Sequence, residues 1–98
     1  MYLKIHQTQK GKIVAACDKE LLGSVLDDGN AYFDLDRYRG FYAGEPAGEE
    51  QLRAALRAFS SANLVGERAV GVALKMALAG KKDVMYINKT PHIQLYNL

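Results

Sequence analysis

The sequence predicts a single α+β domain (residues 1–98) in which two helices pack on one face of a mainly antiparallel sheet. Three observations point to this class. The length of 98 residues allows one hydrophobic core and leaves too little chain for a second. Apolar and polar residues alternate near both ends of the chain, as in strands, and two stretches between them have the period of a helix. The predicted order is β-β-α(short)-β-α-α-β-β.

Residues 2–17 predict a hairpin followed by a corner. Apolar residues alternate in YLKIHQTQ, and KGKIVAAC adds a second apolar run after a glycine turn at Gly11. The segment CDKELLG (17–23) then offers Asp18 as a helix N-cap and Gly23 as a terminating residue. We therefore expect one short helix at this corner of the domain.

The next segments combine a turn, a strand and a loop. The pair Asp28-Gly29 favours a turn, and the aromatic and apolar residues of 31–35 favour a third strand. The stretch RYRGFYAGEPAGEE (37–50) contains three glycines and a proline without a clean period. We expect it to be a loop with exposed aromatic and basic side chains.

The second half predicts two helices and a closing hairpin. Leucine and phenylalanine at helical spacing indicate an amphipathic helix over 49–59. Residues 64–78 are apolar on nearly every side, which indicates a helix largely buried against the sheet and stopped by Gly80. The alternating runs DVMYIN (83–88) and HIQLYN (92–97) predict the hairpin.

Charge and cysteine content narrow the class of protein. The formal net charge of +2 and the sequence pI near 8.7 permit a nucleic-acid partner without requiring one. Cys17 is the single cysteine, so an internal disulfide, a zinc knuckle or an iron–sulfur cluster cannot form. The N-terminal segment lacks a signal-peptide pattern, and the apolar runs are shorter than the about 18 residues of a membrane-spanning helix. We expect a cytoplasmic protein without membrane contact or cofactor.

Four stretches resemble a known family: CDKELLG (17–23), FYAGE (41–45), NLVGERAV (63–70) and TPHIQ (90–94). They span the chain in order and are similar to the archaeal family named domain of unknown function 424. The resemblance implies a small cytoplasmic archaeal protein that belongs with RNA or the translation machinery. Similar proteins more often read Phe-Tyr-Gly-Gly in the loop, and Ala43 departs from that pattern. The family supplies no catalytic residue to carry over.

The first candidate site is the predicted helix start at Asn63, Gly66 and Arg68. If Asn63 caps the helix, the free N–H groups of the first turn form a seat for a phosphate. Gly66 would then allow close approach, and Arg68 would add a charge-assisted bond. In the structural alternative Asn63 is only a cap, and Gly66 and Gly71 let helix and sheet backbones touch.

The second candidate site is RYRGFYAG (37–44), where Arg37 and Arg39 accompany Phe41 and Tyr42. Aromatic faces stack on unpaired bases and arginine contacts phosphate, so this composition suits single-stranded RNA. In the alternative, the aromatic side chains fold back over the edge of the sheet while the arginines stay in solvent.

Histidine, cysteine and paired acids give weaker candidates. His92 could reach a phosphate or another polar ligand at the end of the sheet, or be a strand histidine without a task. A histidine could activate Cys17, but its place in an apolar strand favours a buried thiol. The acids of 27–28 lie in a predicted turn, and neither they nor Asp34 with Asp36 have the spacing of a metal site.

These observations predict a non-enzymatic binding module for RNA or a ribonucleoprotein surface. The alternative is an interaction protein or structural subunit such as a homodimer, because the apolar helix at 64–78 and free sheet edges need cover. A small enzyme ranks third, since no nucleophile, base and orienting group occur at a recognisable spacing.

Overall fold

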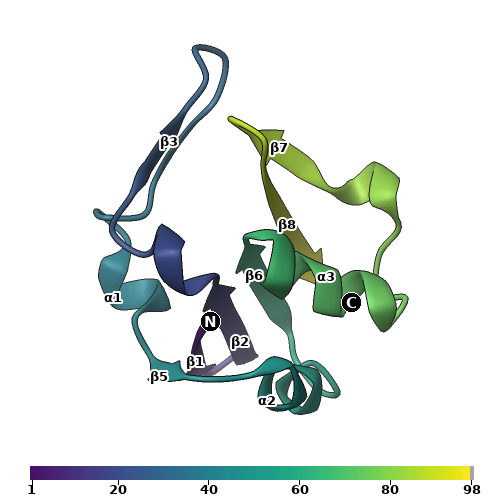
Figure 1. Ribbon diagram of the computed structural model, residues 1–98. Helices are drawn as coiled ribbons and strands as arrows, with labels where there is room; N and C mark the ends of the chain where they lie inside the picture. The colour runs from purple at the N-terminus through teal and green to yellow at the C-terminus, as the bar shows by residue number, and fades with distance from the viewer. Residues whose placement is uncertain (98) are drawn as a thin grey trace.

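A six-stranded sheet forms the centre of the fold (Figure 1). The computed structural model describes residues 1–97. In chain order the strands of this sheet are β1 (Tyr2–Thr8), β2 (Gly11–Cys17), β5 (Glu45–Pro46), β6 (Ser61–Val65), β7 (Met85–Ile87) and β8 (Thr90–Tyr96). Their spatial order is β5-β1-β2-β6-β8-β7. Neighbouring strands are antiparallel except β2 and β6, which are parallel.

The two faces of the sheet are covered by different elements. The helical face carries two helices, and the hairpin face carries a separate two-stranded hairpin and a one-turn helix. These elements are α2 (Glu49–Ala55) and α3 (Glu67–Lys75) on the helical face, and β3 (Val25–Asp27), β4 (Tyr32–Asp34) and α1 (Arg39–Tyr42) on the hairpin face, with the 3-10 helices η1 (Lys19–Leu21) and η2 (Lys81–Asp83) at corners. The α+β class, with two helices on one face, is confirmed.

Alternation along β2 explains why residues 13–17 of this strand are apolar at every position. Val14 and Ala16 point to the helical face, whereas Ala15 and Cys17 point to the hairpin face, and all four are fully buried. A central strand that is covered on both faces has no solvent-exposed face, so polar residues do not alternate with apolar ones along it.

The predicted hairpins at both ends of the chain are confirmed, but the prediction for residues 64–78 is wrong at its start. Leu64 and Val65 belong to β6, and α3 begins only at Glu67 and ends at Lys75. Gly66, with φ of 104°, makes the turn between the strand and the helix. The first helix also ends earlier than predicted, at Ala55, which leaves room for β6. The predicted loop at 37–50 contains α1 and β5.

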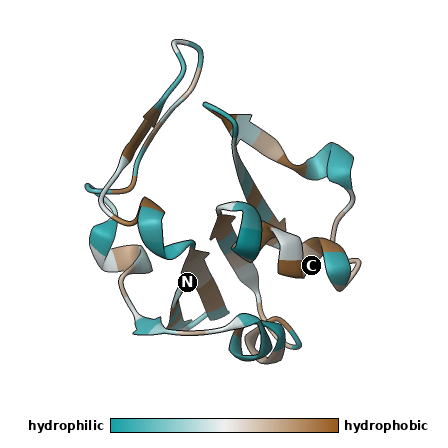
Figure 2. Ribbon diagram, viewed as in Figure 1, coloured by the Kyte–Doolittle hydropathy of each residue, from teal (hydrophilic) through white to brown (hydrophobic). Residues whose placement is uncertain are grey.

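The β3–β4 hairpin is anchored at its tip. Asp27 and Asp28 accept backbone N–H bonds within the turn, as the acid pair in a predicted turn implied. Asp28 Oδ2 also accepts a 3.3 Å bond from the Asn88 N–H of the β7–β8 turn, so the two tips approach each other (Figure 1). These N–H donors lower the pKa of the Asp28 carboxyl. Both tips are hydrophilic (Figure 2).

Candidate functional site

A pocket of about 490 Å³ opens on the hairpin face, between the sheet and the segment that runs from β4 to α1. Its lining combines aromatic rings, two carboxamides, one carboxylate and one arginine; the residues are Tyr32, Phe33, Asp34, Arg37, Tyr38, Phe41, Tyr42, Asn63 and Gln94. We call it the aromatic–amide pocket. Tyr42 is buried, whereas Tyr32 and Tyr38 are more than half exposed, so the pocket runs from a closed end to an open rim.

The rings of the wall hold one another in place. Phe33 packs against Tyr38 at 6.4 Å between centroids and against Tyr42 at 6.2 Å. Tyr42 meets Phe41 edge to face at 5.1 Å, and Phe41 stacks on His6 of β1 at 4.6 Å with 10° between the planes. His6 Nε2 also lies 2.9 Å from the Phe41 carbonyl oxygen. Contacts of this kind fix the ring positions before any ligand arrives.

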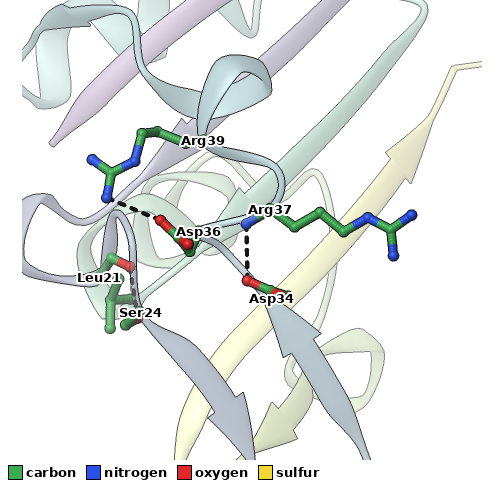
Figure 3. A network of polar contacts seen from close by, with 6 residues as sticks. All are labelled: Leu21, Ser24, Asp34, Asp36, Arg37 and Arg39. Atoms are coloured by element: carbon green, nitrogen blue, oxygen red, sulfur yellow. Dashed lines mark hydrogen bonds and ion pairs between the residues drawn. The ribbon is translucent and has the colours of Figure 1, made fainter.

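Two residues of the lining carry opposite charges: Asp34, which is half-buried, and Arg37, which is exposed at the rim. Asp34 Oδ1 accepts a 2.8 Å bond from the Arg37 backbone N–H, and Asp34 Oδ2 accepts a 3.3 Å bond from the Tyr32 hydroxyl. The negative charge of Asp34 raises the pKa of Tyr32. The Arg37 guanidinium lies over the Tyr38 ring, 5.9 Å from its centroid, and extends away from the loop (Figure 3). The exposed guanidinium of Arg37 therefore suits an anionic part of a ligand, whereas Asp34 favours a neutral part inside the pocket.

The structure brings four of the predicted site residues to the pocket: Arg37, Phe41, Tyr42 and Asn63. Tyr42, however, is only 2% exposed, so it closes the pocket and cannot present a free face to a base. Arg39 is not in the lining. It points to the opposite side from Arg37 and forms an ion pair with Asp36 at 3.2 Å (Figure 3).

The predicted anion site at the start of the helix is wrong, because the carboxylate of Asp18 already occupies that position. Asn63 lies within β6 and caps nothing. The Arg68 and Ala69 N–H groups each donate a 3.0 Å bond to the carboxylate of Asp18, which is 3% exposed. Asp18 therefore caps α3 rather than the corner helix that follows it in sequence. The Arg68 side chain is exposed outside the pocket, and Gly66 packs against Asp18.

His92 is buried rather than available to a phosphate. It lies on β8 opposite Val65, is 6% exposed, and meets the Phe33 ring edge to face at 5.1 Å. Neither ring nitrogen has a hydrogen-bond partner within residues 1–97. Burial lowers the pKa of His92, because the charged ring would lose its hydration there.

Acidification should therefore destabilise the domain through His92. As the pH falls below the ordinary histidine pKa of about 6.5, His92 becomes protonated in the unfolded chain but stays neutral in the folded chain. The free energy of unfolding then drops by at most about 1.4 kcal/mol per pH unit, whereas above that pH the contribution of His92 is constant. Urea denaturation measures the free energy of unfolding at about pH 7.5 and at about pH 5.5. The decrease between these two pH values should be smaller for His92→Leu than for the wild type. Equal losses would contradict the assignment.

Cys17 does not fit the nucleophile alternative. Its thiol is fully buried on the hairpin face. Burial, with a smaller contribution from the charge of Asp18, raises the pKa of Cys17 to about 11. A thiol in this state stays protonated at neutral pH and acts as a small apolar side chain.

Four lining residues were not predicted for a binding site: Tyr32, Phe33, Asp34 and Gln94. Tyr32 and Phe33 were assigned to a strand, and Asp34 was considered only as a metal ligand, whereas Tyr38 lies within the predicted stretch 37–44. Gln94 offered a signal, since it is polar between Ile93 and Leu95, which are both buried. A polar side chain on a strand of this kind marks the place where the sheet face opens to solvent.

The fold and the pocket together define a small α+β domain with a preformed aromatic site on one sheet face. The chain belongs to the family described as protein of unknown function (DUF424), whose model matches residues 5–98. The resemblance carried by the four sequence stretches is thereby confirmed. The search of curated proteins finds no match. Within residues 1–97, no helix is long and apolar enough to cross a membrane.

A solved structure shares this fold. The crystal structure of an uncharacterized conserved protein from Methanopyrus kandleri superposes with a TM-score of 0.79 at 26% sequence identity, over 99% of this chain and 90% of that chain.

Proposed function

We propose that the domain is a non-enzymatic binding module that takes an unpaired base of single-stranded RNA into the aromatic–amide pocket. The observation that carries the proposal is the lining itself, in which aromatic rings stand next to the carboxamides of Asn63 and Gln94 and the guanidinium of Arg37. Single-stranded RNA is recognised by stacking on aromatic side chains, by hydrogen bonds to base edges and by cationic contacts to phosphate.

The charges of the pocket favour a base inside it and a phosphate outside. Asp34 lines the pocket and would repel an anion there. Arg37 is exposed at the rim, where a phosphate next to a bound base can reach it. The modest net charge of +2 implies binding in which stacking supplies much of the affinity.

Catalysis has less support than binding in this pocket. Asp34 is the one lining residue with a carboxylate, and both of its oxygens already accept hydrogen bonds. The Tyr32 hydroxyl does lie next to the Asp34 carboxylate, but the charge of Asp34 raises the pKa of Tyr32, which disfavours the phenolate that would act as a nucleophile.

Binding of a protein partner is the second candidate function. Of the two features that the sequence offered for it, the apolar helix and the free sheet edges, only a sheet edge still supports it. The apolar residues of α3, such as Val70 and Val72, are buried inside the domain and need no further cover. The edge strand β7 still exposes Met85 and Tyr86 by 60% and 63%. An exposed apolar edge is a surface for strand pairing with another chain. Size measurement in solution at increasing concentration tests the homodimer form of this candidate.

Titration of a labelled single-stranded RNA at two salt concentrations tests the RNA proposal. The affinity should fall as salt rises from about 50 to about 200 mM, because phosphate contacts release counterions. Arg37→Ala should weaken binding and reduce the magnitude of the salt slope by about one phosphate contact. Tyr38→Ala should weaken binding about tenfold, because one stacking ring is lost.

The matched control is Arg68→Ala, which removes an exposed arginine outside the pocket. It should leave the affinity unchanged. Absence of binding at low salt would reject the proposal, and so would a loss in Arg68→Ala equal to that in Arg37→Ala.

A further inference from the structure

Two carboxamides on the sheet, those of Asn63 and Gln94, form the side of the aromatic–amide pocket that we call its floor. Asn63 of β6 and Gln94 of β8 are directly opposite each other in the antiparallel register. Side chains in such a pair lie on the same face with Cβ atoms about 5 Å apart. The floor of the pocket is therefore a pair of adjacent carboxamides, one from each strand.

These two carboxamides have free hydrogen-bonding capacity. Within residues 1–97 the Asn63 side chain has no protein hydrogen-bond partner, although Asn63 is half-buried in the middle of the sheet. Gln94 Oε1 accepts a single long bond of 3.4 Å, from the Tyr96 hydroxyl. Asparagine is unfavourable in strands, and the Asn63 amide faces the pocket rather than a protein partner. A ligand that satisfies both groups would account for their place in the lining.

The chemistry of a carboxamide restricts that ligand. Its oxygen accepts and its NH₂ group donates, so it pairs with a base edge that presents a donor next to an acceptor. In adenine the N6 amino group is a donor with an acceptor on each side, N1 on the Watson–Crick edge and N7 on the Hoogsteen edge. Two neighbouring carboxamides can therefore read both edges of one adenine, each through two hydrogen bonds.

The other bases match this pair less well. Guanine presents two acceptors, O6 and N7, on its Hoogsteen edge, so one carboxamide oxygen is left facing an acceptor. Cytosine has an acceptor on only one side of its N4 amino group, and uracil has no amino group. Cytosine and uracil can each satisfy one carboxamide fully but not both, and guanine can satisfy two only through its Watson–Crick edge together with N2 and N3, which lie next to the ribose.

Resting on the proposed function, we infer that Asn63 and Gln94 make the pocket selective for adenine in single-stranded RNA. The aromatic wall supplies stacking to any base, and the paired carboxamides decide which base is held. Loss of one bidentate contact changes base discrimination by about tenfold.

The experiment measures base preference separately from binding. A fluorescein-labelled oligouridine of about eight nucleotides is compared with versions that carry one central adenosine, guanosine or cytidine, at one fixed salt concentration. The wild type should bind the adenosine version about tenfold more tightly than the others. A central 7-deazaadenosine, which lacks the N7 acceptor, should lose most of that advantage.

Two substitutions assign the preference to the floor. Gln94→Leu changes an exposed side chain, so the fold should persist, and Asn63→Leu removes the second carboxamide. Both should bind uridine-only RNA somewhat more weakly than the wild type, because uracil also bonds to one carboxamide, and both should lose the adenine preference. The control Gln7→Leu, an exposed strand glutamine outside the pocket, should keep it.

The outcomes separate the two ideas. Equal affinity for all four central bases, or an adenine preference that persists in both leucine variants, would overturn the selectivity while RNA binding itself stands. Absence of binding to every probe would overturn the selectivity and the proposed function together.

Discussion

Replacement of Gly66 by alanine should lower the free energy of unfolding by about 3–5 kcal/mol, the largest effect that we expect from a single substitution. Gly66 has φ of 104°, a conformation that an alanine adopts only with strain. The added Cβ would also overlap the Cγ and Oδ2 atoms of Asp18. Because Asp18 caps α3, moving its carboxylate away exposes two N–H groups as well. Urea denaturation followed by far-UV circular dichroism measures the loss.

Gly29→Ala is the matched control for this change. Gly29 has a similar φ of 89°, but a Cβ there would meet no atom within 4 Å. Its substitution should cost only the backbone strain, about 1–2 kcal/mol. If the two alanine variants lose the same stability, the contact with Asp18 does not constrain position 66.

Asp18→Ala should lower the free energy of unfolding by about 2–4 kcal/mol. The carboxylate accepts bonds from the Arg68 and Ala69 N–H groups, the second of which is buried, and it neutralises the positive end of the α3 dipole. Asp18→Asn keeps one acceptor oxygen without the charge and should fall between the wild type and the alanine variant. The measurement is again the midpoint and slope of urea unfolding.

An exposed acid provides the comparison for Asp18. Asp36→Ala breaks the surface ion pair with Arg39 and should change the free energy of unfolding by less than about 1 kcal/mol. A loss in Asp18→Ala no larger than that in Asp36→Ala would show that the long-range cap contributes little.

The parts of the fold that the sequence predicted correctly are those with local signals. The β1–β2 and β7–β8 hairpins each join neighbouring runs of alternating residues through a short turn. Strand β6 was missed because it is central and pairs in parallel with β2, so its partner is far away in sequence. Its residues merge with the apolar pattern of α3, and only Gly66 separates the two elements.

The candidate site was predicted in part for the same reason. The composition of residues 37–44 indicated aromatic and basic side chains, and Arg37 and Phe41 do reach the pocket. The sequence could not show that Asn63 lies opposite Gln94, since that register depends on the pairing of two strands 31 positions apart at these residues. Nor could it show that Asp18 occupies the helix start, because that contact joins residues 50 positions apart.

The carboxylate of Asp18 accepts bonds from the first turn of α3 and so links the two halves of the chain that form the pocket. The aromatic wall of the pocket comes from the N-terminal half of the chain and its carboxamides come from the C-terminal half. Loop-closure entropy opposes the joining of these halves until β2 meets β6, so the final structure forms as one cooperative unit. Neither half alone contains the whole lining of the pocket, so under the proposed function a partly unfolded chain would not bind RNA. Under the proposed function, the native state alone would be competent to bind.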